Sequence, residues 1–251
     1  MLGLIAVGLL VGPLVVGTPA AAAPPAGDLP AADAARLGAL MSGSPPADRG
    51  VAFTLRLVPR TDGGRGEEQV AAAESTGGHL VLTFERPARL KGHAALVRYN
   101  LVRYRPATGP MQTVSGLVRH FDYLPLVQFA ALLLVDPSTT HVAARLPDVV
   151  VEGQARQVVR LDERADAHVF EQFEVQADPA SGLPLVARAT SVEDGREWRL
   201  RYRFDNRVET ASGPAPFLSA IEVQAAAGQS WLLTLERPFL IDRAKVQRDL
   251  R

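Results

Sequence analysis

Alternation of apolar and polar residues dominates this chain and predicts that most of it folds as β-strands. Between 51 and 57, every second residue is a large apolar one, which is the period of a half-buried strand. The clearest example is 197–204, where aromatic and leucine residues alternate strictly with a glutamate and three arginines. A strand of this kind belongs to an antiparallel sheet with one covered face and one face in water.

The same pattern, interrupted by glycine, proline and aspartate turn signals, recurs along the chain. It predicts strands at 51–57, 69–74, 80–84, 93–99, 101–105, 111–114, 149–151, 155–161, 169–177, 185–191, 197–204, 218–224 and 231–237. No helix of crossover length separates most of these segments, which argues against a parallel α/β sheet.

One stretch departs from the alternation. Residues 122–136, DYLPLVQFAALLLVD, are almost continuously apolar and predict a helix with Asp122 as N-cap, Pro125 in its first turn and Pro137 beyond its end. The helix is too short to span a bilayer, which needs roughly 20 residues. Because it is apolar on all sides, both of its faces must be covered. A second, amphipathic helix is predicted at 31–41.

Together these elements predict a mainly β (α+β) fold. A one-sided sheet of about ten strands tends to curl, and its concave apolar face needs a cover that only the two helices can supply. We therefore expect a single curved antiparallel half-barrel with helices on its concave face.

The N-terminus predicts export. Asp28 is the first ionisable side chain, an apolar run occupies 2–16, and the small residues 20–23 match a signal-peptide cleavage site. We expect a signal peptide at 1–23, a linker and helix at 24–49, and the half-barrel domain at 50–251, in the periplasm. An uncleaved N-terminal membrane anchor is the alternative.

Charge and composition narrow the function. The 27 basic residues balance 27 acidic ones, so no strong field attracts nucleic acid. There is no cysteine, which excludes disulfides and thiolate metal sites. The five histidines lack metal-site spacing, and Ser115 lacks the nucleophile-elbow context. We therefore expect neither an enzyme nor a bound metal or cofactor.

Several motifs in the correct order carry a family resemblance. The run 82–106 reads LTFERPARLKGHAALVRYNLVRYRP, followed by VEG at 151–153 and the hairpin DPASGLP at 178–184. This series resembles the LolA-like superfamily of outer-membrane lipoprotein carriers and lipoprotein-sorting proteins. The matching positions in the first run are Arg86, Pro87, Gly92, Leu96, Asn100, Leu101, Tyr104 and Pro106.

The resemblance implies a non-enzymatic carrier that binds lipid or lipoprotein acyl chains under a helical lid and passes them to the outer envelope. Its expected partners are lipoprotein-sorting components of the two membranes. Arg86 matches the position that latches the lid in the carrier. The expected cargo walls are Leu124, Val127, Phe129, Ala131, Leu133 and Leu134 of the helix, and Phe53, Leu55, Leu82, Phe84, Leu96 and Leu101 of the strands.

The sequence leaves two alternatives open, one for the central helix and one for the function of the fold. The central helix can be ordinary core packing instead of a lid. The fold can also serve as an envelope sensing or scaffold domain that binds a partner protein through its sheet edge or outer face.

Overall fold

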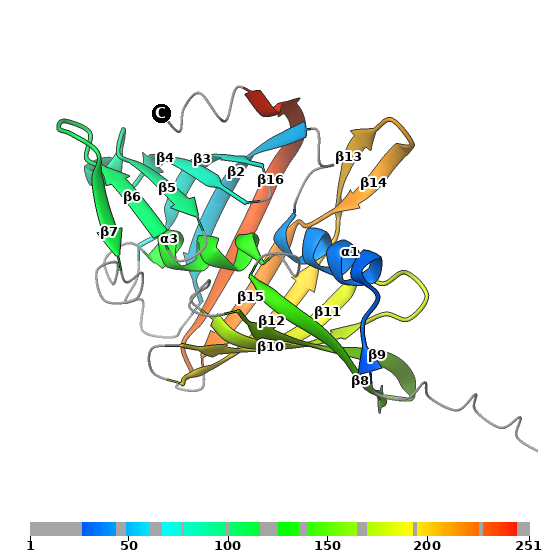
Figure 1. The fold of residues 1–251 in the computed structure, drawn as a ribbon. Helices are drawn as coiled ribbons and strands as arrows, with labels where there is room; N and C mark the ends of the chain where they lie inside the picture. The colour runs from blue at the N-terminus through cyan, green and yellow to red at the C-terminus, as the bar shows by residue number, and fades with distance from the viewer. Residues whose placement is uncertain are drawn as a thin grey trace, which may run out of the picture.

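One large antiparallel sheet dominates the fold in the computed structural model (Figure 1). The structure describes residues 27–43, 49–60, 67–76, 78–98, 101–115, 125–135, 140–164, 170–192, 195–225 and 228–244. The fourteen strands of the sheet are, from edge to edge, β1 (Gly27–Asp28), β8 (His141–Val151), β9 (Gln154–Glu163), β10 (Phe170–Ala177), β11 (Pro184–Ser191), β12 (Glu197–Arg203), β15 (Ala220–Ala225), β16 (Ser230–Asp242), β2 (Arg49–Pro59), β3 (Gln69–Ser75), β4 (Leu80–Arg86), β5 (Ala94–Arg98), β6 (Leu101–Arg105) and β7 (Gln112–Ser115).

The sheet consists of two meanders joined by one long seam. β2 to β7 form the first meander and β8 to β16 the second, and β2 pairs with β16 in the middle of the sheet. This seam runs from Arg49 opposite Asp242 to Pro59 opposite Trp231. The sheet stays open, with β1 and β7 at its two edges, so the predicted half-barrel is confirmed.

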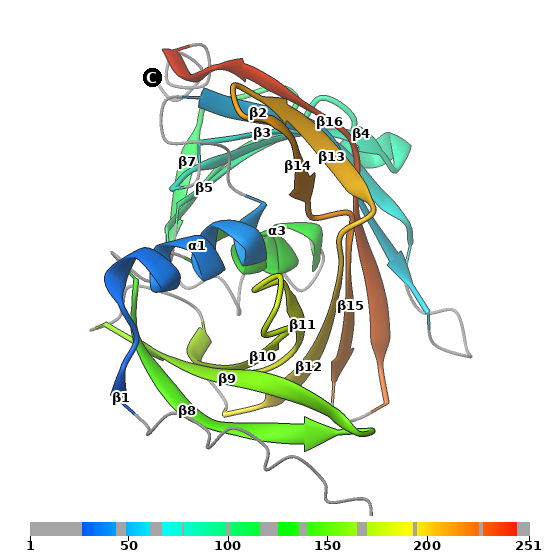
Figure 2. The same cartoon turned by 90° about the vertical axis from the view of Figure 1, so that its right-hand side faces the viewer.

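Helices cover the concave face of the sheet (Figure 2). They are α1 (Ala31–Ser42), α3 (Pro125–Ala130) and the short 3₁₀ helix η2 (Ala131–Leu134), which continues α3 directly. A further 3₁₀ turn, η1 (Ala88–Leu90), connects β4 to β5. None of the described helices has the length and apolar character needed to cross a membrane.

The alternation predicted for 197–204 is confirmed in β12. Leu200 and Tyr202 are buried against the core, whereas Arg199, Arg201 and Arg203 are exposed on the convex face. The same division into a covered and a wet face extends to the neighbouring strands, because cross-strand partners share a face.

Prolines caused the main errors in the predicted strands. β8 begins at His141 instead of residue 149, because Pro147 lies at an irregularity between Leu146 and Val149 in this near-edge strand. A separate hairpin, β13 (Asn206–Thr210) with β14 (Gly213–Phe217), was not predicted. Its second strand contains Pro214 and Pro216, and proline is uncommon inside strands. The predicted signal peptide lies outside the described residues.

Candidate functional site

The candidate site is the concave face of the sheet and the segment that fills it, α3 with η2, called here the plug (residues 125–134). From Leu126 to Val135, every side chain except that of Gln128 is at most 2% exposed. The sequence-based expectation that both faces of this segment are covered is therefore correct. The six α-helical and four 3₁₀ residues of the plug are too few to be stable alone, so packing must hold them in place.

The plug lies between the sheet and α1. α3 packs against β2 and β5, while η2 contacts β5 on one side and α1 on the other. The side chains of all these elements join one hydrophobic cluster, which includes Leu37 and Met41 of α1 and Phe53 of β2. The plug is thus in contact with the same apolar surface that we expect to bind cargo.

An aromatic cluster marks the middle of the plug. The ring centroid of Phe129 lies 5.7 Å from that of Trp198 and 5.1 Å from that of Trp231, and the two tryptophans are 5.8 Å apart. These are the only 2 tryptophans in the chain. Both therefore report optically on the position of the plug.

A buried side chain anchors the start of the plug. The backbone N–H of Leu126 donates a hydrogen bond of 3.0 Å to the Oε1 atom of Gln69, whose residue is 2% exposed. A first-turn N–H has no partner within its own helix, so Gln69 acts as a cap supplied by β3. Sequence reasoning missed this residue. The available signal was its position, because Gln69 is a long polar residue on the covered side of a strand that otherwise places only alanine and serine there.

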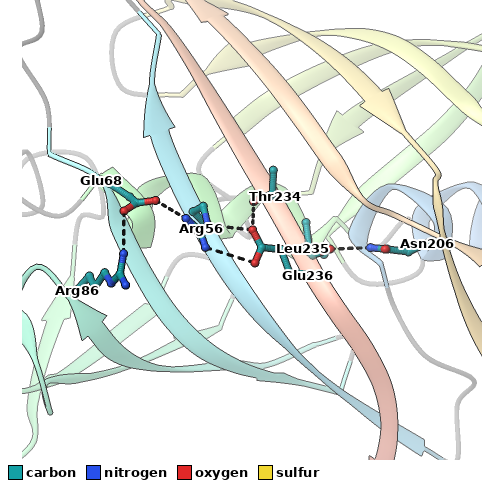
Figure 3. A network of polar contacts seen from close by, with 7 residues as sticks. All are labelled: Arg56, Glu68, Arg86, Asn206, Thr234, Leu235 and Glu236. Carbon is teal, nitrogen blue, oxygen red and sulfur yellow. Dashed lines mark hydrogen bonds and ion pairs between the residues drawn. The ribbon is translucent and has the colours of Figure 1, made fainter.

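Arg86, the predicted latch, belongs to a charged network on the outer side of the same strands (Figure 3). Its Nη1 lies 3.5 Å from Oε2 of Glu68, whose Oε1 is 2.5 Å from Nη1 of Arg56, and Nε of Arg56 is 2.9 Å from Glu236. The hydrogen bond to Glu68 raises the pKa of Arg56. Glu68 directly precedes Gln69, so the network is one residue away from the anchor of the plug. The latch role of Arg86 stays a prediction.

Most of the predicted wall residues are buried in the same hydrophobic cluster as the plug. Phe53, Leu55, Leu82 and Phe84 are at most 4% exposed and belong to the central cluster, together with the plug residues Val127, Phe129, Ala131, Leu133 and Leu134. Leu124 lies outside the described residues.

Leu96 and Leu101 were predicted to line the cargo site, but their side chains do not face the apolar interior. Both are only half-buried and lie outside the central cluster. Their neighbours Ala95, Val97 and Val102 point into it instead. Because side chains alternate between the two faces of a strand, an error of one position moves a residue to the opposite face.

One polar atom faces this apolar interior without a partner. Among the described residues, the buried hydroxyl of Tyr202 makes no hydrogen bond. Burial raises the pKa of Tyr202, so the group stays protonated and can donate. Within the described ranges of the chain, no three His, Asp or Glu side chains lie close enough together to hold a metal ion. The site is therefore an apolar interior that the plug fills, and Gln69 and Tyr202 are polar groups within it.

An open, curved antiparallel sheet with helices filling its concave face is the fold of the LolA superfamily, and the comparisons confirm the predicted resemblance at the level of fold. A LolA superfamily protein from Nitrosomonas europaea superposes with a TM-score of 0.66 at 15% identity, covering 84% of this chain and 93% of that one. A putative outer membrane lipoprotein-sorting protein domain from Vibrio parahaemolyticus gives 0.63 at 14% identity, covering 83% and 93%.

A DUF1329 family protein from Desulfovibrio piger is also similar, with a TM-score of 0.59 at 13% identity over 84% of this chain and 92% of that one. No family model matches the sequence, and no curated protein matches it. The likeness therefore rests on the fold.

Proposed function

We propose that this protein is an exported, non-enzymatic carrier of lipid or lipoprotein acyl chains, which bind between the concave face of the sheet and the plug. The observation that carries the proposal is the burial of a short helical segment, apolar except for Gln128, in the concave face of an open sheet. The similarity to a putative lipoprotein-sorting domain also supports the proposed carrier function.

The energetics favour an exchange between plug and cargo. Burying an acyl chain yields about 0.8 kcal/mol per methylene, so about a dozen methylenes contribute on the order of 10 kcal/mol before ordering costs. An uncovered concave face would be an apolar patch larger than a few hundred Å², which invites aggregation. The plug covers this face in the empty protein, and the acyl chain covers it after the plug has shifted.

The plug is built for such a shift. It is held by side-chain packing and, at its start, by the hydrogen bond from Leu126 to Gln69. Packing against an acyl chain replaces packing against the sheet with little loss, since both surfaces are apolar. Arg86 and Glu68 then control the strand segment that carries Gln69, which is the latch role proposed for Arg86.

The predicted signal peptide supports a periplasmic location, and components that sort lipoproteins between the two membranes are the proposed partners. A partner-binding domain on the same fold is the second candidate function. A charged groove on the convex face favours it.

A fluorescent fatty acid tests the proposal directly. Titration of the purified protein is expected to saturate at one ligand per chain, and unlabelled palmitate is expected to displace the probe. Butyrate, which has the same carboxylate and almost no chain, serves as the matched control and should not compete. Failure to bind any acyl ligand would contradict the proposal.

A further inference from the structure

A groove on the convex face of the sheet has a composition that the fold does not require. It has a volume of about 550 Å³ and crosses β10, β11, β12, β15 and β16. Its charged residues are Arg60, Arg188, Arg199, Arg201, Glu174 and Glu222. A neighbouring hollow of about 320 Å³ shares Arg199 and Gln224 with it, so the two form one elongated depression.

The strand register places like charges opposite each other on the floor of this groove. Arg188 of β11 pairs directly with Arg199 of β12. Like charges in directly opposed positions destabilise a sheet. The carboxylate of Glu197 makes only long contacts with these arginines, 3.9 Å to Arg188 and 3.8 Å to Arg199. The two arginine side chains are 60% and 71% exposed. Both guanidinium groups are therefore accessible to an external anion.

The acidic residues of the groove leave this charge largely uncompensated. Glu222 is already engaged by Arg203 and lies 3.6 Å from Arg60. Arg201 sits opposite Glu222 in the register, yet it has no ion-pair or hydrogen-bond partner among the described residues. The joined depression is lined by four arginines and three glutamates, Glu174, Glu197 and Glu222, in a chain whose overall charge is zero.

The arrangement also defines the shape of a ligand. Arg188 lies on β11, and Arg60 directly follows the last residue of β2. Three strands, β12, β15 and β16, lie between β11 and β2, which corresponds to about 19 Å, or about six residues of extended peptide. Guanidinium groups held on rigid strands match carboxylates in a bidentate geometry. A flat bilayer surface fits a hollow of this kind poorly.

We propose that the convex groove binds an extended acidic peptide segment of a partner protein. The strands separate this groove from the plug, so the proposal does not depend on acyl binding. It assigns to the two faces of β10 to β16 two different ligands, an apolar one inside and an anionic one outside.

Fluorescence polarisation with a fluorescein-labelled peptide of alternating glutamate and glycine tests this proposal. The wild-type protein is expected to bind it, more weakly as salt is added, and not to bind the matched glutamine peptide. The double variant Arg188→Glu/Arg199→Glu should weaken binding by about tenfold or more. Arg105→Glu/Arg207→Glu makes the same charge change at exposed positions outside the groove and should leave binding close to wild type.

Two further measurements keep the result independent of folding. Arg199→Gln removes the like-charge pair, so its melting temperature should equal or exceed that of the wild type while peptide binding falls. Glu174→Gln should tighten binding. Equal losses in the groove variant and the control variant would overturn the proposal. Arginine-dependent binding to phosphatidylglycerol vesicles without peptide binding would also overturn it, in favour of a membrane surface.

Discussion

The two helical segments on the concave face are built differently. α1 buries one side, with Leu37 and Met41 in the core and Arg36 exposed. It ends at the left-handed Gly43, whose N–H caps the last turn, and Arg36 donates a hydrogen bond of 2.9 Å to the carbonyl oxygen of Ser181 in the β10–β11 turn. α1 is therefore an ordinary amphipathic cover, with one face suited to water.

The plug has no such face. It contains no charged residue, every side chain from Leu126 to Leu134 except that of Gln128 is buried, and its helix changes from α to 3₁₀ after six residues. It cannot leave the sheet for water without exposing apolar surface, whereas the proposed acyl chain would offer it another apolar surface. In the proposed function, α1 is therefore the fixed cover and the plug is the exchangeable one.

The largest expected effect comes from truncating the plug. Phe129→Ala should reduce the free energy of unfolding by about 3–5 kcal/mol, because Phe129 is 2% exposed and packs against both tryptophans. The proposed function has plug and cargo compete for one surface, so it predicts that the same variant binds fatty acid more tightly. Urea denaturation and probe titration measure the two effects.

Leu37→Ala in α1 is the matched control for this truncation. Leu37 is 5% exposed, so the variant should lose about 2–5 kcal/mol of stability and show unchanged fatty-acid affinity. An equal change in affinity in both variants would remove the distinction between a fixed and an exchangeable cover.

The anchor of the plug gives the next largest effect. Gln69→Ala leaves the buried N–H of Leu126 without its acceptor, which should cost about 1–3 kcal/mol of stability and increase fatty-acid affinity. Arg36→Ala removes the exposed hydrogen bond of α1. Its effects on stability and on fatty-acid affinity should each be only a small fraction of those of Gln69→Ala. A Gln69 variant that binds cargo like the wild type would show that this bond does not hold the plug.

Tyr202→Phe tests the polar group of the interior. Its hydroxyl is buried without a partner among the described residues, so its removal should stabilise the empty protein by about 1 kcal/mol. Thermal unfolding in the absence of ligand is the measurement. Destabilisation of that size would mean that the hydroxyl contributes a hydrogen bond in the empty protein.

Arg86→Ala should have the smallest effect on stability. Its side chain is 66% exposed and its contact with Glu68 is 3.5 Å long, and exposed ion pairs of this kind contribute about 0.2–1 kcal/mol at most. If Arg86 acts as a latch, fatty-acid affinity rises in this variant, though less than in Gln69→Ala. Arg86→Lys, which keeps the charge, should have a fatty-acid affinity closer to that of the wild type.

The comparison of the helices also shows what the sequence could predict. The alternation in β12 and the all-round apolar character of the plug were sufficient to predict their burial, because both patterns are local. The anchor at Gln69 joins residues 57 positions apart, and the curl of the sheet brings them together. No local pattern contains that information.

The inward positions of β5 and β6 show a second limit. Leu96 and Leu101 are larger apolar residues than Ala95, yet Ala95 faces the core and the leucines do not. These strands carry apolar residues on both faces, so hydrophobicity alone leaves the register undecided. In β8 the apolar run was visible, but Pro147 concealed that the strand continues through an irregularity.

Tryptophan fluorescence during a titration with unlabelled palmitate tests the central claim most directly, since Trp198 and Trp231 both contact Phe129 of the plug. Movement of the plug should change the emission and saturate at one palmitate per chain, and Phe129→Ala should show a smaller change. Palmitate binding at that stoichiometry with unchanged emission in the wild type would contradict the claim that cargo displaces the plug.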